Sequence, residues 1–180
     1  MTSQLRVDKI VPVDGVPTGG GGGIVQIQQT VYTGVKSQSG AIATPLTDFE
    51  GVFTCSLTPK FSTSKILIIM NLLVGASGDT TIAGTIERGS TPIGIHDARN
   101  SRTRNTFGCG ILATSGTWQS HSVSHTILDS PATTSATTYS VKIGGNGGRT
   151  VFINREGRDA DNATDTTVGS STITLMEISA

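Results

Sequence analysis

The stretch that most constrains the fold of this chain is 64–75, which reads SKILIIMNLLVG and is the most apolar run in the sequence. With the period of two that a β-strand gives, one face of this run is entirely apolar. The other face holds Leu67, Ile69 and Leu73 beside Lys65 and Asn71. The run is too short for a membrane span, which needs about 20 apolar residues. Its β-branched residues and the glycines that follow it favour a strand.

A strand with two apolar faces needs a cover on both sides. Burial of one face alone gains less free energy than ordering the backbone of the strand costs. We therefore expect the even-numbered side chains to fill the core of a β-sandwich and the odd-numbered ones to meet another subunit. The predicted subunit interface consists of Leu67, Ile69, Asn71 and Leu73. Within it, Asn71 is expected to pair with its symmetry mates, with water or with a backbone group.

Composition favours a β-protein and argues against two classes of partner. The chain has 180 residues, enough for one domain with an arm, and its 13 basic and 13 acidic residues give a formal net charge of zero. The basic excess that attracts nucleic acid or an anionic membrane is therefore missing. Charged residues make up only 14% of the chain, beside 23 glycines, which is typical of turn-rich secreted or virion-surface proteins. We expect no nucleic-acid partner and no membrane insertion.

Residues 1–23 differ from the rest of the chain. Apolar residues are scattered among charged ones, and the segment ends in five consecutive glycines, Gly19–Gly23. These glycines predict a flexible tether, because no Lys-Ser or Lys-Thr follows them as a phosphate-binding loop requires. The start of the chain also lacks the basic and apolar regions of a signal peptide, so none is expected. The sequence predicts an extended arm over 1–23 whose apolar side chains attach to another protein; these are Leu5, Val7, Ile10, Val11, Val13 and Val16.

From residue 24 to 180, short apolar-alternating segments follow one another with turn signals between them, and no run has a helical period. The tetrapeptide Arg88-Gly89-Ser90-Thr91 predicts a hairpin turn. The fold class predicted is all-β, an antiparallel β-sandwich of jelly-roll type over 24–180. The expected strands are 24–32, 51–57, 64–75, 81–87, 92–96, 107–113, 117–128, 137–144, 149–154 and 170–178.

Two cysteines, Cys55 and Cys109, could form at most one disulfide. Each alternates with apolar neighbours, so both are expected to face inward. Two buried free thiols are the simpler interpretation. A disulfide across the sandwich is the alternative.

Two polar groups have residue types that can bind metal ions. His121 and His125 lie about 13 Å apart if the segment is a strand, too far to share a metal. The acidic segment with Asp159, Asp161 and Asp165 could hold Ca²⁺ through oxygens, but it lacks the glycine and terminal glutamate of an EF-hand loop. A solvated loop is the simpler interpretation, and we predict no metal site and no cofactor.

The remaining candidates belong to surface loops. Arginines form one basic cluster without interleaved aromatic residues, which favours a surface loop or ion pairs with a neighbouring subunit over nucleic-acid binding. The single tryptophan could anchor a sugar, although packing at the rim of the core is simpler. The possible surface-binding residues are Arg99, Arg102, Arg104, Trp118, Asp159 and Asp161.

No pattern of a hydrolytic enzyme is present. The chain has no G-x-S-x-G elbow, no H-E-x-x-H motif and no spaced carboxylate pair in an apolar setting. We therefore predict a protein that is not an enzyme, and a depolymerase is disfavoured.

Several segments resemble known families. The strand order, with the hairpin TIAGTIERGSTPIG and the last strand ITLMEI, resembles the trimeric C1q and tumour-necrosis-factor-type jelly roll. The segments LRVDKIVPVDGVPTGGGGGIVQ, LDSPATTSATTYSVKI, TVFINR and TITLMEI resemble virion structural proteins of marine tailed phages, such as cyanophages.

This resemblance implies a trimeric fibre or appendage component with an exposed jelly-roll head. Its partners would be its own copies and other virion structural proteins, and its place the tail fibre, an appendage or the capsid surface. The alternatives are a capsid decoration protein and a module that binds a carbohydrate or receptor on the host surface.

Overall fold

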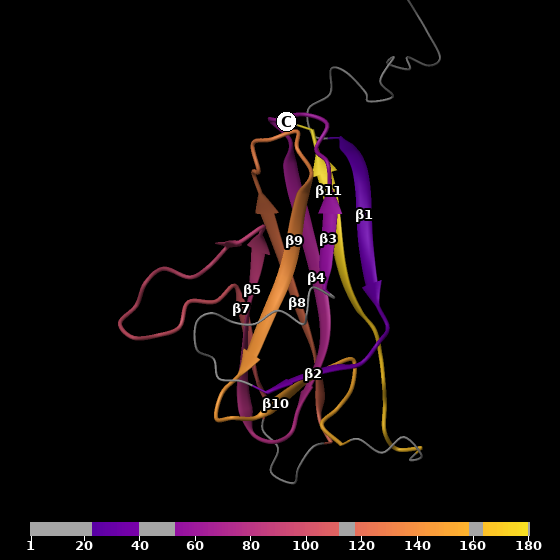
Figure 1. Cartoon of the computed structure of the whole chain (residues 1–180), viewed down its shortest axis with the longest axis vertical. Helices are drawn as coiled ribbons and strands as arrows, with labels where there is room; N and C mark the ends of the chain where they lie inside the picture. The colour runs from indigo at the N-terminus through magenta and orange to yellow at the C-terminus, as the bar shows by residue number, and fades with distance from the viewer. Residues whose placement is uncertain (1–22, 40–52, 112–117, 159–163, 180) are drawn as a thin grey trace, which may run out of the picture.

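A computed structural model of the chain describes residues 23–39, 53–111, 118–158 and 164–179. Two sets of predicted residues lie outside this description: Leu5, Val7, Ile10, Val11, Val13 and Val16 of the arm, and Asp159 and Asp161 of the acidic segment. The described residues form two antiparallel sheets without a helix (Figure 1), which confirms an all-β sandwich. The strands are β1 (Ile24–Tyr32), β2 (Lys36–Ser39), β3 (Thr54–Leu57), β4 (Lys65–Ala76), β5 (Thr80–Arg88), β6 (Thr91–Ile93), β7 (Phe107–Ile111), β8 (Ser120–Asp129), β9 (Thr137–Gly145), β10 (Thr150–Ile153) and β11 (Ser171–Ile178).

Strand β4 is the centre of the six-stranded sheet. Strand β8 pairs along one edge of β4, while β11 and then β10 pair along the other edge. Beyond these two strands, β1 pairs with β11 and β2 pairs with β10. In the five-stranded sheet the order is β3-β9-β5, with β6 and β7 both on the far side of β5. The most apolar run of the sequence thus has a neighbouring strand on each side.

The even-numbered side chains of β4 fill the core, as the alternation predicts. Ile66, Ile68, Met70 and Val74 are 0% exposed, because they face the five-stranded sheet. Both sheets contribute to one apolar cluster, which forms a single core between them. Its members from the five-stranded sheet and the segment before it are Phe53, Cys55, Leu57, Ile82, Ile86, Phe107, Ile111, Tyr139, Val141 and Ile143.

The strand limits differ from the prediction at a few places. Strand β2 was not expected, because KSQS carries no apolar residue, and it is a strand through its pairing with β10. Strand β6 ends at Ile93, three residues before the expected end at His96. The predicted hairpin is present: Arg88 pairs with Thr91, so that Gly89 and Ser90 form a two-residue turn. Gly89 has φ of 59°, a conformation that glycine adopts without strain.

Both ends of the described sandwich lie at the same pole. The backbone N–H of Ser179 donates to the carbonyl of Gly23 at 3.0 Å, just outside the ends of β11 and β1. At the opposite pole, the β4–β5 and β9–β10 connections meet, where the N–H of Ser77 donates to the carbonyl of Thr150 at 2.9 Å. The start of β1 is therefore a sandwich length away from these turns (Figure 1).

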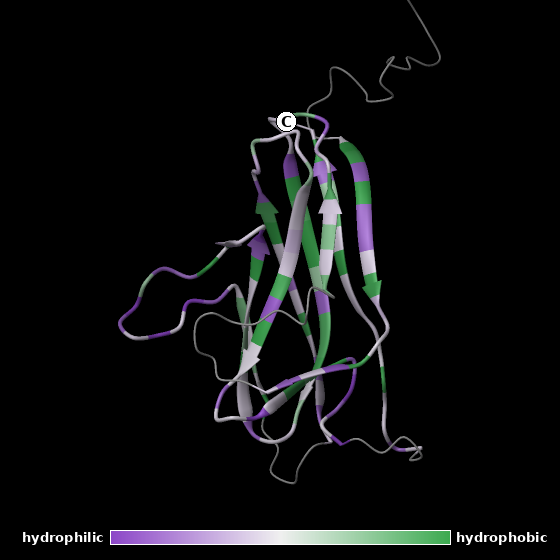
Figure 2. Cartoon of the chain, viewed as in Figure 1, coloured by the Kyte–Doolittle hydropathy of each residue, from purple (hydrophilic) through white to green (hydrophobic). Residues whose placement is uncertain are grey.

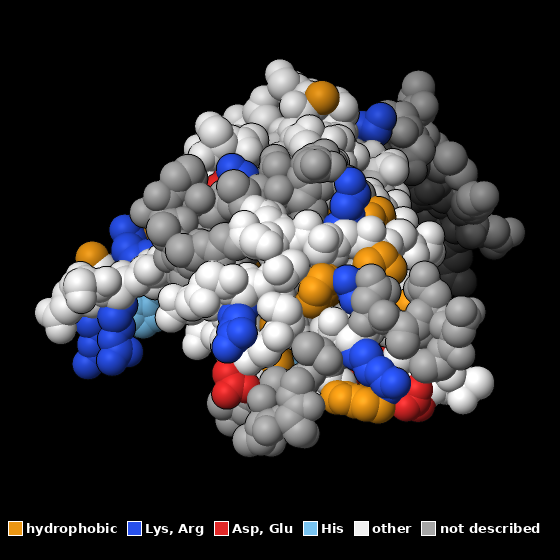
Figure 3. Space-filling model, turned by 60° about the horizontal axis from the view of Figure 1, so that its bottom comes forward, with side chains coloured by type: hydrophobic (Ala, Val, Ile, Leu, Met, Phe, Trp, Pro, Cys, Tyr) orange, Lys and Arg blue, Asp and Glu red, His pale blue; other side chains and the backbone are white. Residues whose placement is uncertain are grey.

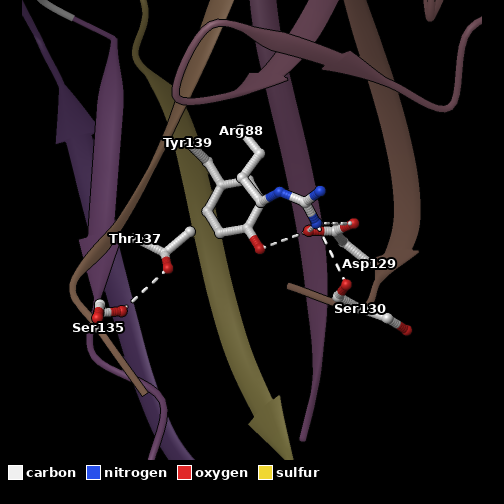
Figure 4. A network of polar contacts seen from close by, with 6 residues as sticks. All are labelled: Arg88, Asp129, Ser130, Ser135, Thr137 and Tyr139. Carbon is white, nitrogen blue, oxygen red and sulfur yellow. Dashed lines mark hydrogen bonds and ion pairs between the residues drawn. The ribbon is translucent and has the colours of Figure 1, made fainter. Parts of the chain in front are cut away.

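A polar cluster joins the two sheets where β5 and β8 end (Figure 4). Arg88 Nη1 on β5 donates to both carboxylate oxygens of Asp129 on β8, at 2.9 and 2.8 Å. The hydroxyl of Tyr139 on β9 donates to Asp129 Oδ2 at 2.7 Å. Burial of Tyr139, together with its hydrogen bond to Asp129, raises the pKa of the phenol. The cluster ties β8 to the opposite sheet.

A buried carboxylate ties β11 to its surroundings in the same way. Glu177 is 0% exposed and accepts hydrogen bonds from Gln26 Nε2 at 2.5 Å and from the N–H of Lys60 at 2.7 Å. Burial alone would raise its pKa, but hydrogen bonds from Gln26 and from the N–H groups of Lys60 and Phe61 outweigh burial and lower it. Glu177 therefore fastens the β3–β4 connection to β1 and β11.

The cysteines lie at opposite edges of the same sheet. Cys55 is on β3 and Cys109 on β7, with β9 and β5 between them. Three strand spacings amount to about 14 Å, beyond the reach of a disulfide. Both thiols are free, and burial raises the pKa of each. The alternative of a disulfide across the sandwich is wrong, and Cys109 is only half-buried because β7 is an edge strand.

Candidate interaction surfaces

The six-stranded sheet exposes a row of apolar side chains on its outer side. We call the side chains of this sheet that point away from the core the outward face. On it, Leu67 lies between Leu128 of β8 and Met176 of β11, and Met176 is next to Ile27 of β1. Leu128 is 49% and Ile27 52% exposed. Four neighbouring strands therefore contribute to one apolar row.

The next rows of the outward face mix apolar and polar groups. Ile69 lies between Thr126 and Thr174, and Gln29 Nε2 donates to Thr174 Oγ1 at 2.7 Å. One step further along β4, Asn71 is exposed. The side chains in these rows are short or already paired along the sheet, so they leave Leu67 and Ile69 accessible.

Asn71 has a partner that the sequence did not predict. Ser124 Oγ on β8 donates to Asn71 Oδ1 at 2.6 Å. Symmetry mates, water or a backbone group were expected, whereas the observed partner is a side chain of the same subunit. The reason is the register, which places Ser124 directly opposite Asn71.

The chain itself covers one end of the outward face. Leu73 is half-buried, and a β-carbon on Gly169 would collide with its side chain. Gly75 is buried beneath the carbonyl of Arg155, which leaves no room for a β-carbon there. The chain itself therefore covers part of the odd-numbered side of β4 at this end. The open part of the predicted interface is the part with Leu67 and Ile69.

Asn154 holds this covering segment in place. Its backbone has φ of 65° and its side chain is fully buried. The side-chain amide donates to the carbonyls of Tyr32 at 2.7 Å and Gly34 at 2.8 Å, and its oxygen accepts from Ser171 Oγ at 2.6 Å. The backbone N–H of Asn154 donates to the carbonyl of Leu73 at 2.8 Å. One residue thus connects four segments that are distant in sequence.

The two histidines of β8 face the core side of the sheet. His121 pairs with Val74 and His125 with Met70, both of which point inward. Each histidine is half-buried. No group of three or more potential metal-binding side chains occurs in the part of the chain that the structure describes.

The three predicted arginines lie together on one long connection, 94–106, between β6 and β7. Arg99, Arg102 and Arg104 are all exposed on this loop, which projects from the five-stranded sheet (Figure 1) and is largely hydrophilic (Figure 2). Arg104 Nε donates to the carbonyl of His96 at 2.6 Å, which fixes one guanidinium to the base of the loop. Figure 3 shows a group of basic side chains beside a histidine on this projection. Asp97 is the single acidic residue of the loop.

The same loop and the five-stranded sheet enclose a hollow of about 670 Å³. From the sheet, it is lined by Thr85 and Glu87 of β5 and by Lys142 of β9. Lys142 Nζ lies 2.8 Å from Glu87 Oε2. None of these three was singled out from the sequence; the alternation of their strands could have placed them on one face, but not beneath the loop.

Trp118 lies just before β8 and contacts Arg158. The indole is half-exposed, and the guanidinium carbon of Arg158 lies 3.8 Å from its ring centre. Arg158 Nη1 in turn lies 2.9 Å from Asp165 Oδ2. One face of the indole is therefore covered, and Trp118 sits at the rim of the sandwich.

Comparison with known proteins identifies no related protein. No protein-family model matches the chain, and no curated protein matches it significantly. Within the described ranges, no helical segment has the length and apolar character needed to cross a bilayer.

Proposed function

We propose that this chain is a structural protein of a phage particle. It acts as a homotrimer with a jelly-roll head of the C1q and tumour-necrosis-factor type, attached to the particle through the N-terminal arm. The exposed apolar row of the outward face carries the proposal, because such a row is typical of a surface that another subunit covers.

The strand order supports a jelly roll. With the short strands β2, β6 and β10 set aside, the two sheets have the orders β1-β11-β4-β8 and β3-β9-β5-β7. Among these eight strands, each connection except β5–β7 crosses from one sheet to the other. Two Greek keys wound together give this pattern.

The outward face supports assembly with copies of the same chain. Burial of a large apolar side chain contributes about 1.5–3 kcal/mol, and the row offers Leu67, Leu128, Met176 and Ile27 together. On one side of the row the neighbouring positions are the uncharged Thr126, Thr174 and Gln29, so little desolvation opposes burial there. On the other side the exposed Lys65 of β4 is the charged neighbour, and its long side chain can keep its ammonium group in water at the border of an interface. A closed ring of identical subunits would cover the face in every copy.

The positions of the chain ends support attachment at one pole. β1 begins next to the end of β11, as the Gly23–Ser179 contact places them. An arm that enters there leaves the turns of the opposite pole and the β6–β7 loop free to face outward. A fibre or decoration head needs this separation of anchor and exposed surface.

Sedimentation equilibrium tests the proposed interface. We expect a trimeric wild type and a monomeric Ile69→Asp variant, because a carboxylate inside an apolar interface has no partner. Ser56→Asp, on the exposed side of the other sheet, is the matched control and should remain trimeric. A monomeric wild type, or a trimeric Ile69→Asp variant, would contradict the proposal.

A further inference from the structure

We propose that the hollow between the β6–β7 loop and the five-stranded sheet binds an acidic saccharide. It lies on the sheet opposite to the outward face, so the inference goes beyond the structural role and does not depend on the trimer. Loop residues 100–104 form one wall, and strands β5 and β9 form the other. Its volume of about 670 Å³ is within the range of about 300–1,000 Å³ that ligand pockets occupy.

Two arginines give the lining of the hollow an excess of positive charge. Arg102 and Arg104 belong to the exposed loop, and both also line a second, smaller hollow of about 370 Å³. A guanidinium offers paired donors that match a carboxylate or a sulfate. Because Arg104 is fixed by its bond to His96, less freedom is lost when it binds a ligand.

The wall formed by the sheet carries polar groups that can form hydrogen bonds with sugar hydroxyls: a neutral hydroxyl and an ion pair. Thr85 is only 6% exposed, and its hydroxyl oxygen has no hydrogen-bond partner within the described residues. A buried hydroxyl without a partner is costly, so a ligand hydroxyl that reaches this oxygen from the hollow would relieve the cost. Beside it, the Glu87–Lys142 pair offers an acceptor and a donor.

The same lining argues against a nucleic acid as the ligand. Glu87 adds a carboxylate to the lining, which would repel a chain of phosphates. No aromatic side chain lines this hollow, as far as its residues are described, and stacked bases would need one. An acidic sugar can instead direct its charged group to the arginines and its hydroxyls to Thr85 and Glu87.

Titration calorimetry on the full chain tests the inference. The probes are tetragalacturonate and a sulfated chondroitin tetrasaccharide, with neutral maltotetraose and a single-stranded tetradeoxynucleotide as competitors. We expect at least one acidic saccharide to bind, and each of Arg102→Gln and Arg104→Gln to weaken it about tenfold, the value of one charge-assisted hydrogen bond. Thr85→Val keeps the shape of the side chain and should also weaken binding. Arg149→Gln, which removes the same charge from the exposed β9–β10 turn, should leave binding unchanged.

Four other outcomes of these titrations would overturn the inference. Equal binding of maltotetraose would contradict the acidic class, and equal binding of the tetranucleotide, or an equal loss in Arg149→Gln, would indicate unspecific attraction. No binding of either acidic saccharide would exclude the site. Sedimentation of the same samples separates the two proposals, because an intact trimer that binds no saccharide contradicts the saccharide site alone.

Discussion

Ser124 donates a hydrogen bond to the side-chain oxygen of Asn71 across 2.6 Å, in the middle of the outward face. The pair satisfies a polar group inside the surface that we propose to be covered by another subunit. A hydrogen bond that is exposed in a free subunit but buried in an assembly contributes differently to folding and to assembly.

Ser124→Ala should therefore weaken the trimer more than it weakens the subunit. In a monomer, water can replace the lost hydroxyl, so we expect a change in unfolding free energy below about 0.5 kcal/mol. In the trimer, Asn71 Oδ1 would be buried without a donor, at a cost of about 1–3 kcal/mol. Sedimentation of the wild type and Ser124→Ala gives the change in the dissociation constant of the trimer. Denaturant unfolding of the same substitution in the monomeric Ile69→Asp background gives the change in the unfolding free energy of the subunit. Equal effects on the two quantities would contradict burial of the pair.

Asn154 should be among the most sensitive positions of the sandwich. Asn154→Ala removes three side-chain hydrogen bonds and places alanine at φ of 65°, so we expect a loss of about 2–5 kcal/mol in unfolding free energy. Asn146→Ala, at an exposed turn, is the control and should change stability by less than about 1 kcal/mol. Urea unfolding compares the two; a loss in Asn154→Ala no larger than in the control would disprove the role of the amide.

The examples of Asn154 and β4 show what the sequence could and could not predict. The inward set from Ile66 to Val74 was predictable, because strict alternation of large apolar residues has one physical solution in a sandwich. The role of Asn154 was not, because its partners Tyr32, Gly34 and Ser171 come from distant segments and have no local pattern.

The same limit applies to the cysteines and to the hollow. Alternation indicated that Cys55 faces inward, but only strand order reveals that Cys109 belongs to the same sheet. Likewise, the arginine cluster was visible in the sequence, whereas Thr85 and Lys142 join it only because the β6–β7 loop and the outer side of the five-stranded sheet line one hollow. Tertiary pairing, which short-range patterns do not encode, decides both cases.

Tyr139 should make stability fall at alkaline pH. Burial and the bond to Asp129 raise the pKa of Tyr139 above its ordinary value of 10.0, so the neutral phenol is favoured in the folded state. The resulting stabilisation is fully present below pH 10 and is lost as the pH rises towards the folded-state pKa. Tyr139→Phe should lower the unfolding free energy by about 1–2 kcal/mol at pH 7 and flatten the decline above pH 10. An unchanged alkaline slope in this variant would contradict the assignment.

Glu177 should make stability fall at acid pH. Hydrogen bonds lower its pKa below the ordinary value of 4.5, so the unfolded chain binds the proton more readily than the folded chain. The stabilisation is therefore fully present above pH 4.5 and is lost as the pH falls through the lower folded-state pKa. Glu177→Gln should be less stable at pH 7 and less sensitive to acid between pH 5 and 3, whereas Asp97→Asn on the exposed loop should retain the wild-type profile. Thermal melts across this range compare the three proteins.

Removal of the arm should separate folding from attachment. A chain that lacks residues 2–22 keeps Gly23, whose carbonyl accepts the N–H of Ser179, and keeps every strand of both sheets. Because the core and the outward face remain complete, we expect a folded trimer with unchanged thermal stability. Incorporation into particles should be lost, because the apolar side chains that we propose to bind the particle belong to the deleted arm. Mixing tagged full-length and shortened proteins during particle assembly, followed by purification of the particles, measures this directly; recovery of the shortened protein at the level of the full-length one would show that the head carries the attachment.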